Sequence, residues 1–268
     1  MKRLTAVATT IFFSAALNAA TGIFPDKNLE AAVRKHVFSK RDNQEPITED
    51  DVKSLSVITA TKAGIRDLSG LEKCKSVAML ELAGNEISDL TPLKDLLNVQ
   101  SLDLANNKVQ NLAPIATLTR LQYLNLTGNM VSDLTPLKDL TALNSLYLSN
   151  NKVSSLAPLS GLNKLWSLYV DGNAVKDVTP VAGLPFLSSL DLTGNQVSDI
   201  RPLEKLTSIW KLYLDKNKVS DLSPLIAMAR KGPAGNPRFV TLTGNPLSAA
   251  AKSSQIAELE KLACRVTQ

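Results

Sequence analysis

The amino-acid sequence repeats one pattern every 22 residues over most of its length. The pattern L-x-L-x-x-N starts at residues 80, 102, 124, 146, 190 and 212, and Leu168-x-Val170 replaces the leucine pair in the repeat before residue 190. An apolar residue follows each asparagine by two positions, and a proline follows five positions later. A unit of this length cannot bury its apolar side alone, so consecutive copies must pack on one another in a row.

Each copy of the pattern predicts a short strand and a return segment. Leucines two residues apart face one side of a strand, while the residues between and beside them face the other side. The rest of the repeat is long enough for the crossover that a parallel neighbour requires, and the proline starts a tight helical turn there. The chain is therefore expected to be an α/β protein, a leucine-rich repeat solenoid with short helical or 3-10 turns opposite a parallel sheet.

An asparagine recurs at one place in the repeats, where the chain bends inward. Its amide group can satisfy buried backbone groups of adjacent turns. We interpret these eight asparagines as structural. They are Asn85, Asn107, Asn129, Asn151, Asn173, Asn195, Asn217 and Asn245.

The repeats depart from the pattern at both ends of the array. The first turn has Ala63 in place of asparagine, and the last strand follows its predecessor by 28 residues because six residues are inserted around KGPAGNPR. Terminal repeats expose apolar side chains unless they are capped. We therefore expect a helical N-terminal cap at residues 21–57, about nine turns, seven of them regular, at 58–247 and a helical C-terminal cap at 248–268.

Both expected caps contain helix signals. Asp26 can cap a short helix, and Thr48 with Asp51 resembles a capping box. Apolar residues follow at helical spacing in each cap. They are Leu29, Val33 and Val37 in the first cap and Ile256, Leu259, Leu262 and Val266 in the second.

Residues 1–20 have the order of a secretory signal peptide. Lys2 and Arg3 precede an apolar stretch that ends in Ala19 and Ala20, after either of which we expect cleavage. The alternative is an N-terminal helix packed on the core. The stretch is too short to span a bilayer comfortably, so we expect no membrane span in the mature chain. Cleavage leaves 28 of 30 basic residues against 25 acidic ones, which lowers the formal charge from +5 to +3 and argues against nucleic acid as a partner.

One histidine and two cysteines limit the chemistry available to the chain. They exclude a histidine-rich metal cage, a disulfide framework and any mechanism that needs two histidines. His36 is expected to be a surface or cap-packing residue. Cys74 and Cys264 are predicted to lie about 35 Å apart, too far for a disulfide within the chain, although Cys264 could pair between chains. Because common catalytic, phosphate-binding and calcium motifs are absent, we predict no enzymatic activity, cofactor or metal.

The outward positions of the strands hold the tyrosines and tryptophans. If the first leucine of L-x-x-L-x-L-x-x-N is position one, positions three, five and seven face outward and position two lies where the chain enters the strand. Aromatic and charged groups on a rigid sheet are typical of a recognition surface, although tyrosine also favours strands for packing reasons. The residues are Tyr123 at position three, Tyr147, Tyr169, Tyr213, Asp103 and Asp191 at five, Asp171 and Asp215 at seven, and Trp166 and Trp210 at two.

The two tryptophans predict a notch at the edge of the sheet. Trp166 and Trp210 are two repeats apart, about 10 Å, and only Ser188 lies between them in their column. The inserted segment ends in Arg238, which is also at position two. We therefore predict a partner-binding hot spot with further contacts along the sheet. Its members are Trp166, Tyr169, Trp210, Tyr213 and Arg238, flanked by Asp171 and Asp215, with Tyr147 and Tyr123 further along the sheet.

The sequence resembles the internalin-type leucine-rich repeat proteins of bacteria. The resemblance covers residues 23 to about 247 and rests on IFPDKNLEAAVRKHV, ITEDDVKSL, ITATKAGIRDLSGLEKC and repeats of the form LTGNxVSDLTPLKDLTxL. It implies a curved right-handed solenoid that binds a protein on its concave sheet, outside the bacterial cytoplasm. Internalins continue into an immunoglobulin-like domain and often a wall anchor. This chain ends about twenty residues after its last repeat without an LPxTG-like motif, so host-cell adhesion is not expected.

These observations favour a non-catalytic protein-binding module, secreted or periplasmic, that acts as a monomer and recognises a protein partner. A carbohydrate-binding envelope protein is a second hypothesis, because tryptophan and tyrosine beside aspartate also suit a glycan. A regulatory or inhibitory subunit of another protein is a third, and it differs from the first only in the partner.

Overall fold

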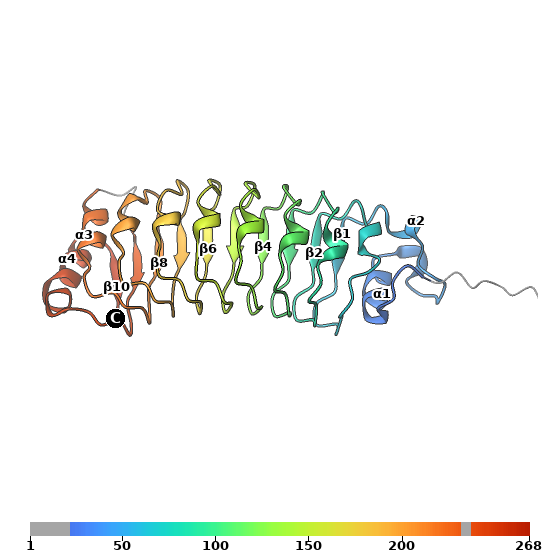
Figure 1. The fold of residues 1–268 in the computed structure, drawn as a ribbon, viewed down its shortest axis with the longest axis horizontal. Coiled ribbons are helices and arrows are strands. Elements are labelled where there is room, and N and C mark those ends of the chain that lie inside the picture. Colours follow the sequence, from blue (N-terminus) through green and yellow to red (C-terminus); the bar gives the residue numbers. More distant parts are fainter. Residues whose placement is uncertain (1–21, 232–236) are drawn as a thin grey trace, which may run out of the picture.

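A computed structural model of the protein describes residues 22–231 and 237–268, and the predicted signal peptide lies outside them. The repeats stack side by side into an elongated right-handed solenoid (Figure 1). In the described part of the chain, one sheet of ten parallel strands follows the chain order, and each strand has three residues. The strands are β1 Val57–Thr59, β2 Met79–Glu81, β3 Ser101–Asp103, β4 Tyr123–Asn125, β5 Ser145–Tyr147, β6 Ser167–Tyr169, β7 Ser189–Asp191, β8 Lys211–Tyr213, β9 Phe239–Thr241 and β10 Arg265–Thr267.

The register of the sheet follows the sequence period. The central leucine of each regular strand pairs with the one 22 residues later, as Leu102 pairs with Leu124, and both are fully buried. Leu212 of β8 pairs with Val240 of β9, which is 28 residues away. The insertion therefore lengthens the return segment and leaves the sheet undisturbed.

The return segments contain short helical turns on the convex side, as predicted. From η3 on, each turn has proline in its first or second position, where the missing backbone N–H costs nothing. Before the insertion the turn is extended into helix α3, Ser223–Arg230. The 3-10 turns are η2 Leu71–Lys73, η3 Thr91–Leu93, η4 Ala113–Ile115, η5 Thr135–Leu137, η6 Ala157–Leu159, η7 Thr179–Val181 and η8 Arg201–Lys205.

The asparagine column joins neighbouring repeats. The Nδ2 of Asn129 donates to the carbonyls of Leu104 and Leu126, each at 2.9 Å, and its Oδ1 accepts from the backbone N–H of Val109 at 2.9 Å. The other seven asparagines bond in the same way, and Asn245 does so across the insertion. The predicted structural role of the column is confirmed.

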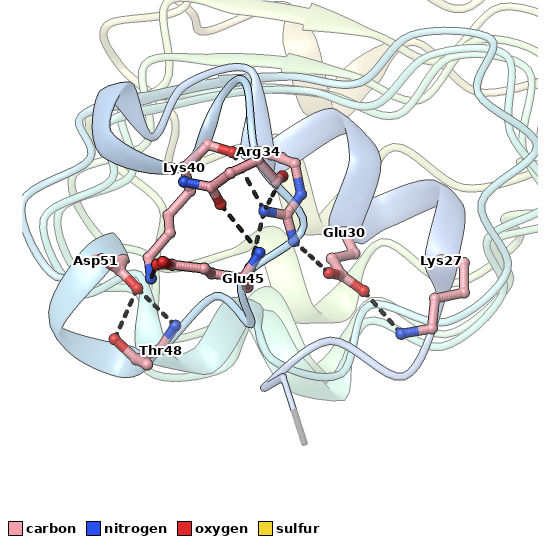
Figure 2. Close-up of polar contacts among 8 residues, drawn as sticks. Lys27, Glu30, Arg34, Lys40, Glu45, Thr48 and Asp51 are labelled. Atoms are coloured by element: carbon pink, nitrogen blue, oxygen red, sulfur yellow. Dashed lines mark hydrogen bonds and ion pairs between the residues drawn. The ribbon is translucent and has the colours of Figure 1, made fainter. Parts of the chain in front are cut away.

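The N-terminal cap consists of α1 Lys27–Arg34, the 3-10 turn η1 Phe38–Lys40 and α2 Glu49–Val52. Asp26 accepts from two backbone N–H groups of the first turn of α1, and Thr48 with Asp51 forms the expected capping box. Figure 2 shows Arg34 at the centre of the cap. Its Nη1 donates to three backbone carbonyls, and its Nη2 donates to Glu30 at 2.6 Å. This guanidinium holds the loop between the helices against α1.

The C-terminal cap is partly helical and partly strand. A π-helical turn, η9 Ala251–Gln255, leads into α4 Ile256–Lys261. The predicted helix over Val266 is wrong there, because residues 265–267 form β10 and pair with β9. Ala263 takes a left-handed conformation with φ 63°, and the N–H of Cys264 bonds back to the carbonyl of Leu259, which ends the helix and turns the chain into the sheet.

Both cysteine thiols are free and buried. Burial raises the pKa of Cys74 to about 12 and that of Cys264 to about 11. The sequence leaves open a disulfide between chains at Cys264. Only 1% of Cys264 is exposed, which argues against such a disulfide. Among the described residues, no helix is long and apolar enough to cross a membrane.

Candidate functional site

The two tryptophans border a notch where the chain enters the sheet. Trp166 precedes β6 and Trp210 precedes β8, and the two residues are 61% and 55% exposed. The notch between them has a volume of about 440 Å³. The arrangement that the repeat spacing predicts is therefore present in the structure. The residues that line the notch are Trp166, Ser167, Tyr169, Ser188, Ser189, Trp210 and Lys211.

The backbone fixes the spacing across the notch. The N–H of Ser188 donates to the carbonyl of Trp166 at 2.9 Å, and the N–H of Trp210 donates to the carbonyl of Ser188 at 2.7 Å. The three residues thus continue the hydrogen-bond ladder of the sheet beyond its strands. Serine between two tryptophans leaves the space open, because its side chain is small. The notch is consequently a rigid feature of the repeat array.

The floor of the notch is formed by serine hydroxyls and a tyrosine. Ser167 and Ser189 occupy the outward position at the start of β6 and β7. The hydroxyl of Tyr169 lies 3.1 Å from the Oγ of Ser189, so the phenol is tied across to the neighbouring strand. The site thus combines aromatic walls with a hydroxyl-lined floor.

A second group of side chains extends the site toward the end of the array. The guanidinium of Arg238 lies 5.8 Å from the centre of the Trp210 ring, which places it where a cation–π contact stabilises the indole. Tyr213 packs edge-on against Phe239, with 5.7 Å between ring centres, and the guanidinium of Arg265 lies over the Phe239 ring, 5.9 Å from its centre. Sequence reasoning missed Phe239, although its outward position three was a usable signal.

The tyrosines stack along the sheet on the other side of the notch. The rings of Tyr147 and Tyr169 lie 5.0 Å apart and nearly parallel, and Tyr123 lies 5.4 Å from Tyr147. Burial raises the pKa of Tyr123 and Tyr147, and also that of Tyr213. The tyrosine stack, residues Tyr123, Tyr147 and Tyr169, therefore joins the centre of the sheet to the notch.

The aspartates divide into two roles. Asp171 accepts from the hydroxyl of Ser149, and Asp215 accepts from the hydroxyl of Thr241 and from the N–H of Thr243. These two predicted flanking residues thus bond to neighbouring turns. Asp191 lies in register between Tyr169 and Tyr213.

Among the described residues, no basic side chain pairs with the carboxylate of Asp191. Burial raises its pKa, and the negative charges of Asp171 and Asp215 raise it further, while the N–H of Thr193, 2.9 Å from Oδ1, lowers it. A cation placed beside Asp191 would relieve this repulsion.

A second groove occupies the other end of the same face. It has a volume of about 430 Å³ and includes Tyr123 together with Val57 and Met79, which are 40% and 38% exposed. Tyr123 therefore lies outside the notch, at the far end of the tyrosine stack. Sequence reasoning missed Val57 and Met79, although apolar side chains at outward positions could have revealed them.

His36 and the acidic side chains outside the notch do not form a metal site in the described residues. The Nε2 of His36 accepts from the N–H of Thr59 at 3.0 Å, so the histidine covers an edge group of β1, as a cap residue should. Within the described residues, no group of three or more histidine, cysteine, aspartate or glutamate side chains could hold a metal ion. The concave face offers contacts for recognition, with aromatic rings, hydroxyls and charges.

Known proteins share this architecture. A family model described as Leucine Rich repeats (2 copies) matches residues 97–139. The crystal structure of internalin C2 from Listeria monocytogenes is similar at 36% identity and a TM-score of 0.76, over 82% of this chain and 95% of that one. Internalin F from the same organism is similar at 30% identity and a TM-score of 0.82, over 94% of this chain and 72% of that one.

A leucine-rich repeat protein of Leptospira interrogans shares the fold at 20% identity and a TM-score of 0.64, over 74% of this chain and 56% of that one. No curated protein matches the chain. The match to internalin C2 covers nearly the whole of that chain. The chain belongs to the internalin family of bacterial leucine-rich repeat proteins.

Proposed function

We propose that this chain is an exported, non-catalytic module that binds a protein partner on its concave sheet. The observation that carries the proposal is a surface of seven aromatic residues on the outward face of the sheet, called the aromatic surface. The whole chain has only 12 tryptophan, tyrosine and phenylalanine residues, and more than half of them lie on this one face. Aromatic side chains contribute much of the binding energy at protein interfaces. The aromatic surface is Tyr123, Tyr147, Trp166, Tyr169, Trp210, Tyr213 and Phe239.

The exposed tryptophans support binding more strongly than the tyrosines do. The residues of the tyrosine stack are half-buried and contact one another, so packing within the sheet accounts for part of their presence. Trp166 and Trp210 keep more than half of their surface in water. A large exposed apolar ring on a rigid notch stabilises a complex when a partner covers it.

The histidine and the two cysteines of the chain support a non-catalytic role. His36 is committed to the backbone of Thr59, and the raised pKa values of the buried Cys74 and Cys264 keep both thiols protonated at neutral pH. Neither kind of group reaches the notch. Export rests on the signal-like residues 1–20, and the mass of the mature N-terminus together with its recovery from the envelope or medium tests it.

Substitution of Trp210 by alanine tests the proposal. The partner is first captured from an envelope extract by crosslinking and identified, and its affinity for the wild type is then measured by calorimetry. We expect Trp210→Ala to weaken binding at least tenfold, about 1.4 kcal/mol, because the substitution removes one wall of the notch. The thermal unfolding temperature should stay unchanged, because the indole is 55% exposed.

Phe186→Ala is the matched control for this experiment. Phe186 is 59% exposed and belongs to the repeat between the two tryptophans, but it does not line the notch. Its loss should leave the affinity unchanged. Equal affinities of the wild type and the Trp210→Ala protein would contradict the proposal.

Carbohydrate binding is the second candidate, and the notch itself favours it. A tryptophan wall, serine hydroxyls and the nearby Asp191 can together contact the faces and hydroxyl groups of a sugar. A glycan array with the wild type and with Trp166→Ala separates the candidates, because glycan binding that Trp166→Ala abolishes favours the second. A regulatory or inhibitory role differs from the first candidate only in the identity of the captured partner.

A further inference from the structure

The spacing of the two tryptophans matches the period of one kind of peptide backbone. They are separated by two strand spacings, about 10 Å. A polyproline II helix has three residues per turn and rises 3.1 Å per residue, so the same face recurs about every 9 Å. In an extended β-strand the same face recurs about every 7 Å, which does not match.

The hydrogen-bond donors of the notch distinguish polyproline II from an α-helix. Among the described residues, none accepts a hydrogen bond from the indole N–H groups of Trp166 and Trp210 or from the ammonium of Lys211. An α-helix uses its backbone carbonyls internally and would leave these donors without partners. A polyproline II segment has no internal hydrogen bonds, so its carbonyls are free to accept from the notch.

The charge beside the notch indicates which side chains accompany the prolines. Asp191 follows Ser189 by two residues on β7, so its carboxylate lies within reach of a long side chain that starts in the notch. It is held between two tyrosines and near two other aspartates, with no basic side chain paired to it in the described residues. A basic residue of the partner would complement this charge.

We propose that the notch binds a proline-rich segment of the partner in the polyproline II conformation, with arginine or lysine beside the prolines. This inference rests on the proposed function and specifies the chemistry of the partner at that site. The tryptophans pack on proline rings, the indole N–H groups and Lys211 donate to the free carbonyls, and Asp191 pairs with the basic residue. Aromatic-lined grooves recognise polyproline II segments because these segments lose little entropy on binding.

Intrinsic fluorescence tests the proposal directly, because the chain has two tryptophans and both border the notch. The probe is a synthetic peptide of nine prolines with two arginines at one end, titrated into the full-length protein. Two control peptides replace all prolines by alternating alanine and serine, or both arginines by glutamate. We expect a saturable change in fluorescence with the probe and at least about tenfold weaker binding of each control peptide.

Three variants connect the signal to the geometry. Ser188→Leu fills the notch but keeps both tryptophans, and it should weaken binding of the probe at least about tenfold. Asp191→Asn keeps an acceptor for the N–H of Thr193 and should weaken binding about threefold, with a smaller preference for arginine over glutamate. Gln122→Leu is the matched control, because Gln122 is exposed in the same column outside the notch, and it should leave binding unchanged.

The outcomes separate this inference from the proposed function. The inference is wrong if the probe causes no saturable change, if the alanine–serine peptide binds as well as the probe, or if Ser188→Leu binds with wild-type affinity while it remains folded by circular dichroism. A captured protein partner that loses affinity with Trp210→Ala but is not displaced by the probe would overturn the inference and leave the proposed function intact. A fluorescence change with an oligosaccharide but not with the probe would overturn the inference and favour carbohydrate binding, the second candidate function.

Discussion

At the scale of single residues, the asparagine column carries the polar contacts between repeats. Asn129 is 7% exposed, and its side-chain amide bonds to two carbonyls and one N–H that lie outside the strands and helices. Leucine or valine could fill the same space but would leave the N–H of Val109 without an acceptor, and an unpaired buried group costs about 1–3 kcal/mol. This explains why one polar residue recurs in a core that is otherwise aliphatic.

Asn129→Ala should therefore destabilise the protein by about 1–3 kcal/mol, because the buried N–H of Val109 loses its acceptor, while the two carbonyls each keep a second donor from the asparagine of an adjacent repeat. Urea unfolding followed by circular dichroism measures the change in the free energy of unfolding. Asn163→Ala is the control, because Asn163 is exposed in a return segment and the same substitution there should change stability by less than about 0.5 kcal/mol. Similar losses from both substitutions would contradict the structural role of the column.

The sequence predicts the column of each site residue but not its partners. Position and period correctly place Trp166, Ser188 and Trp210 side by side. They do not indicate that Asp171 and Asp215 bond to neighbouring turns while Asp191 remains the unbalanced charge. The difference arises because a side chain's partners depend on which residues the next repeats present, and these outward residues vary from repeat to repeat.

At the scale of elements, the N-terminal cap depends on one guanidinium. Arg34 is 12% exposed in its side chain, and it reaches the backbone carbonyls of Lys40, Asn43 and Glu45 as well as Glu30. Arginine is suited to this because its planar group presents several donors in fixed directions. The loop that connects the cap helices therefore has a polar centre instead of an apolar one (Figure 2).

Arg34→Met should destabilise the cap by about 1–3 kcal/mol, because it removes the donor to three backbone carbonyls, two of them in partly buried bonds, and one of the two cationic partners of Glu30. Lys27→Met is the matched control: Lys27 pairs with the same Glu30 at 2.8 Å, but its side chain is 81% exposed, so the loss should stay below about 1 kcal/mol. Hydrogen exchange measured by mass spectrometry should rise in residues 38–52 of the arginine variant and stay unchanged at β8. Equal exchange in both variants would contradict this account.

The two caps differ in how far the sequence predicts them. Asp26, Thr48 and Asp51 are local signals, and the helices that they predict are present. At the C-terminus, Leu262 and Val266 continue a helical spacing, yet the chain leaves the helix after Lys261. The open edge of β9 decides this outcome, because pairing with it satisfies backbone groups that a longer helix could not reach. A tertiary contact of this kind is invisible to periodicity.

At the scale of the whole molecule, an acid-sensitive hydrogen bond to aspartate recurs along the convex side of the solenoid. Aspartates before the helical turns accept hydrogen bonds from the residue two positions on, as Asp133 accepts from the N–H of Thr135 at 2.8 Å. The hydroxyl and N–H of that threonine lower the aspartate's pKa. Asp89, Asp177, Asp199 and Asp221 are similar, and the Arg201 side chain lowers the pKa of Asp199 to about 2.

These lowered pKa values determine how stability should depend on pH. Because each pKa lies below its ordinary value of 3.8, the folded state keeps its carboxylates ionised at a pH where the unfolded chain binds protons. The stabilisation is therefore complete above about pH 4 and is lost as the pH falls through the lowered values toward 2. Since repeats contact only their neighbours, the losses should add along the array.

One repeat of the chain has asparagine in place of this aspartate, so an asparagine substitution is a suitable test. Asn111 accepts from the N–H of Ala113 at 2.9 Å in the place that Asp133 occupies one repeat later. A variant with asparagine at positions 89, 133 and 177 should be less stable than the wild type at pH 6, and this difference should shrink toward zero as the pH falls from about 4 to 2. Urea unfolding across this range measures it. A difference of the same size at pH 6 and pH 2.5 would mean that the aspartates act through shape alone, because only an ionised carboxylate can lose its contribution by protonation.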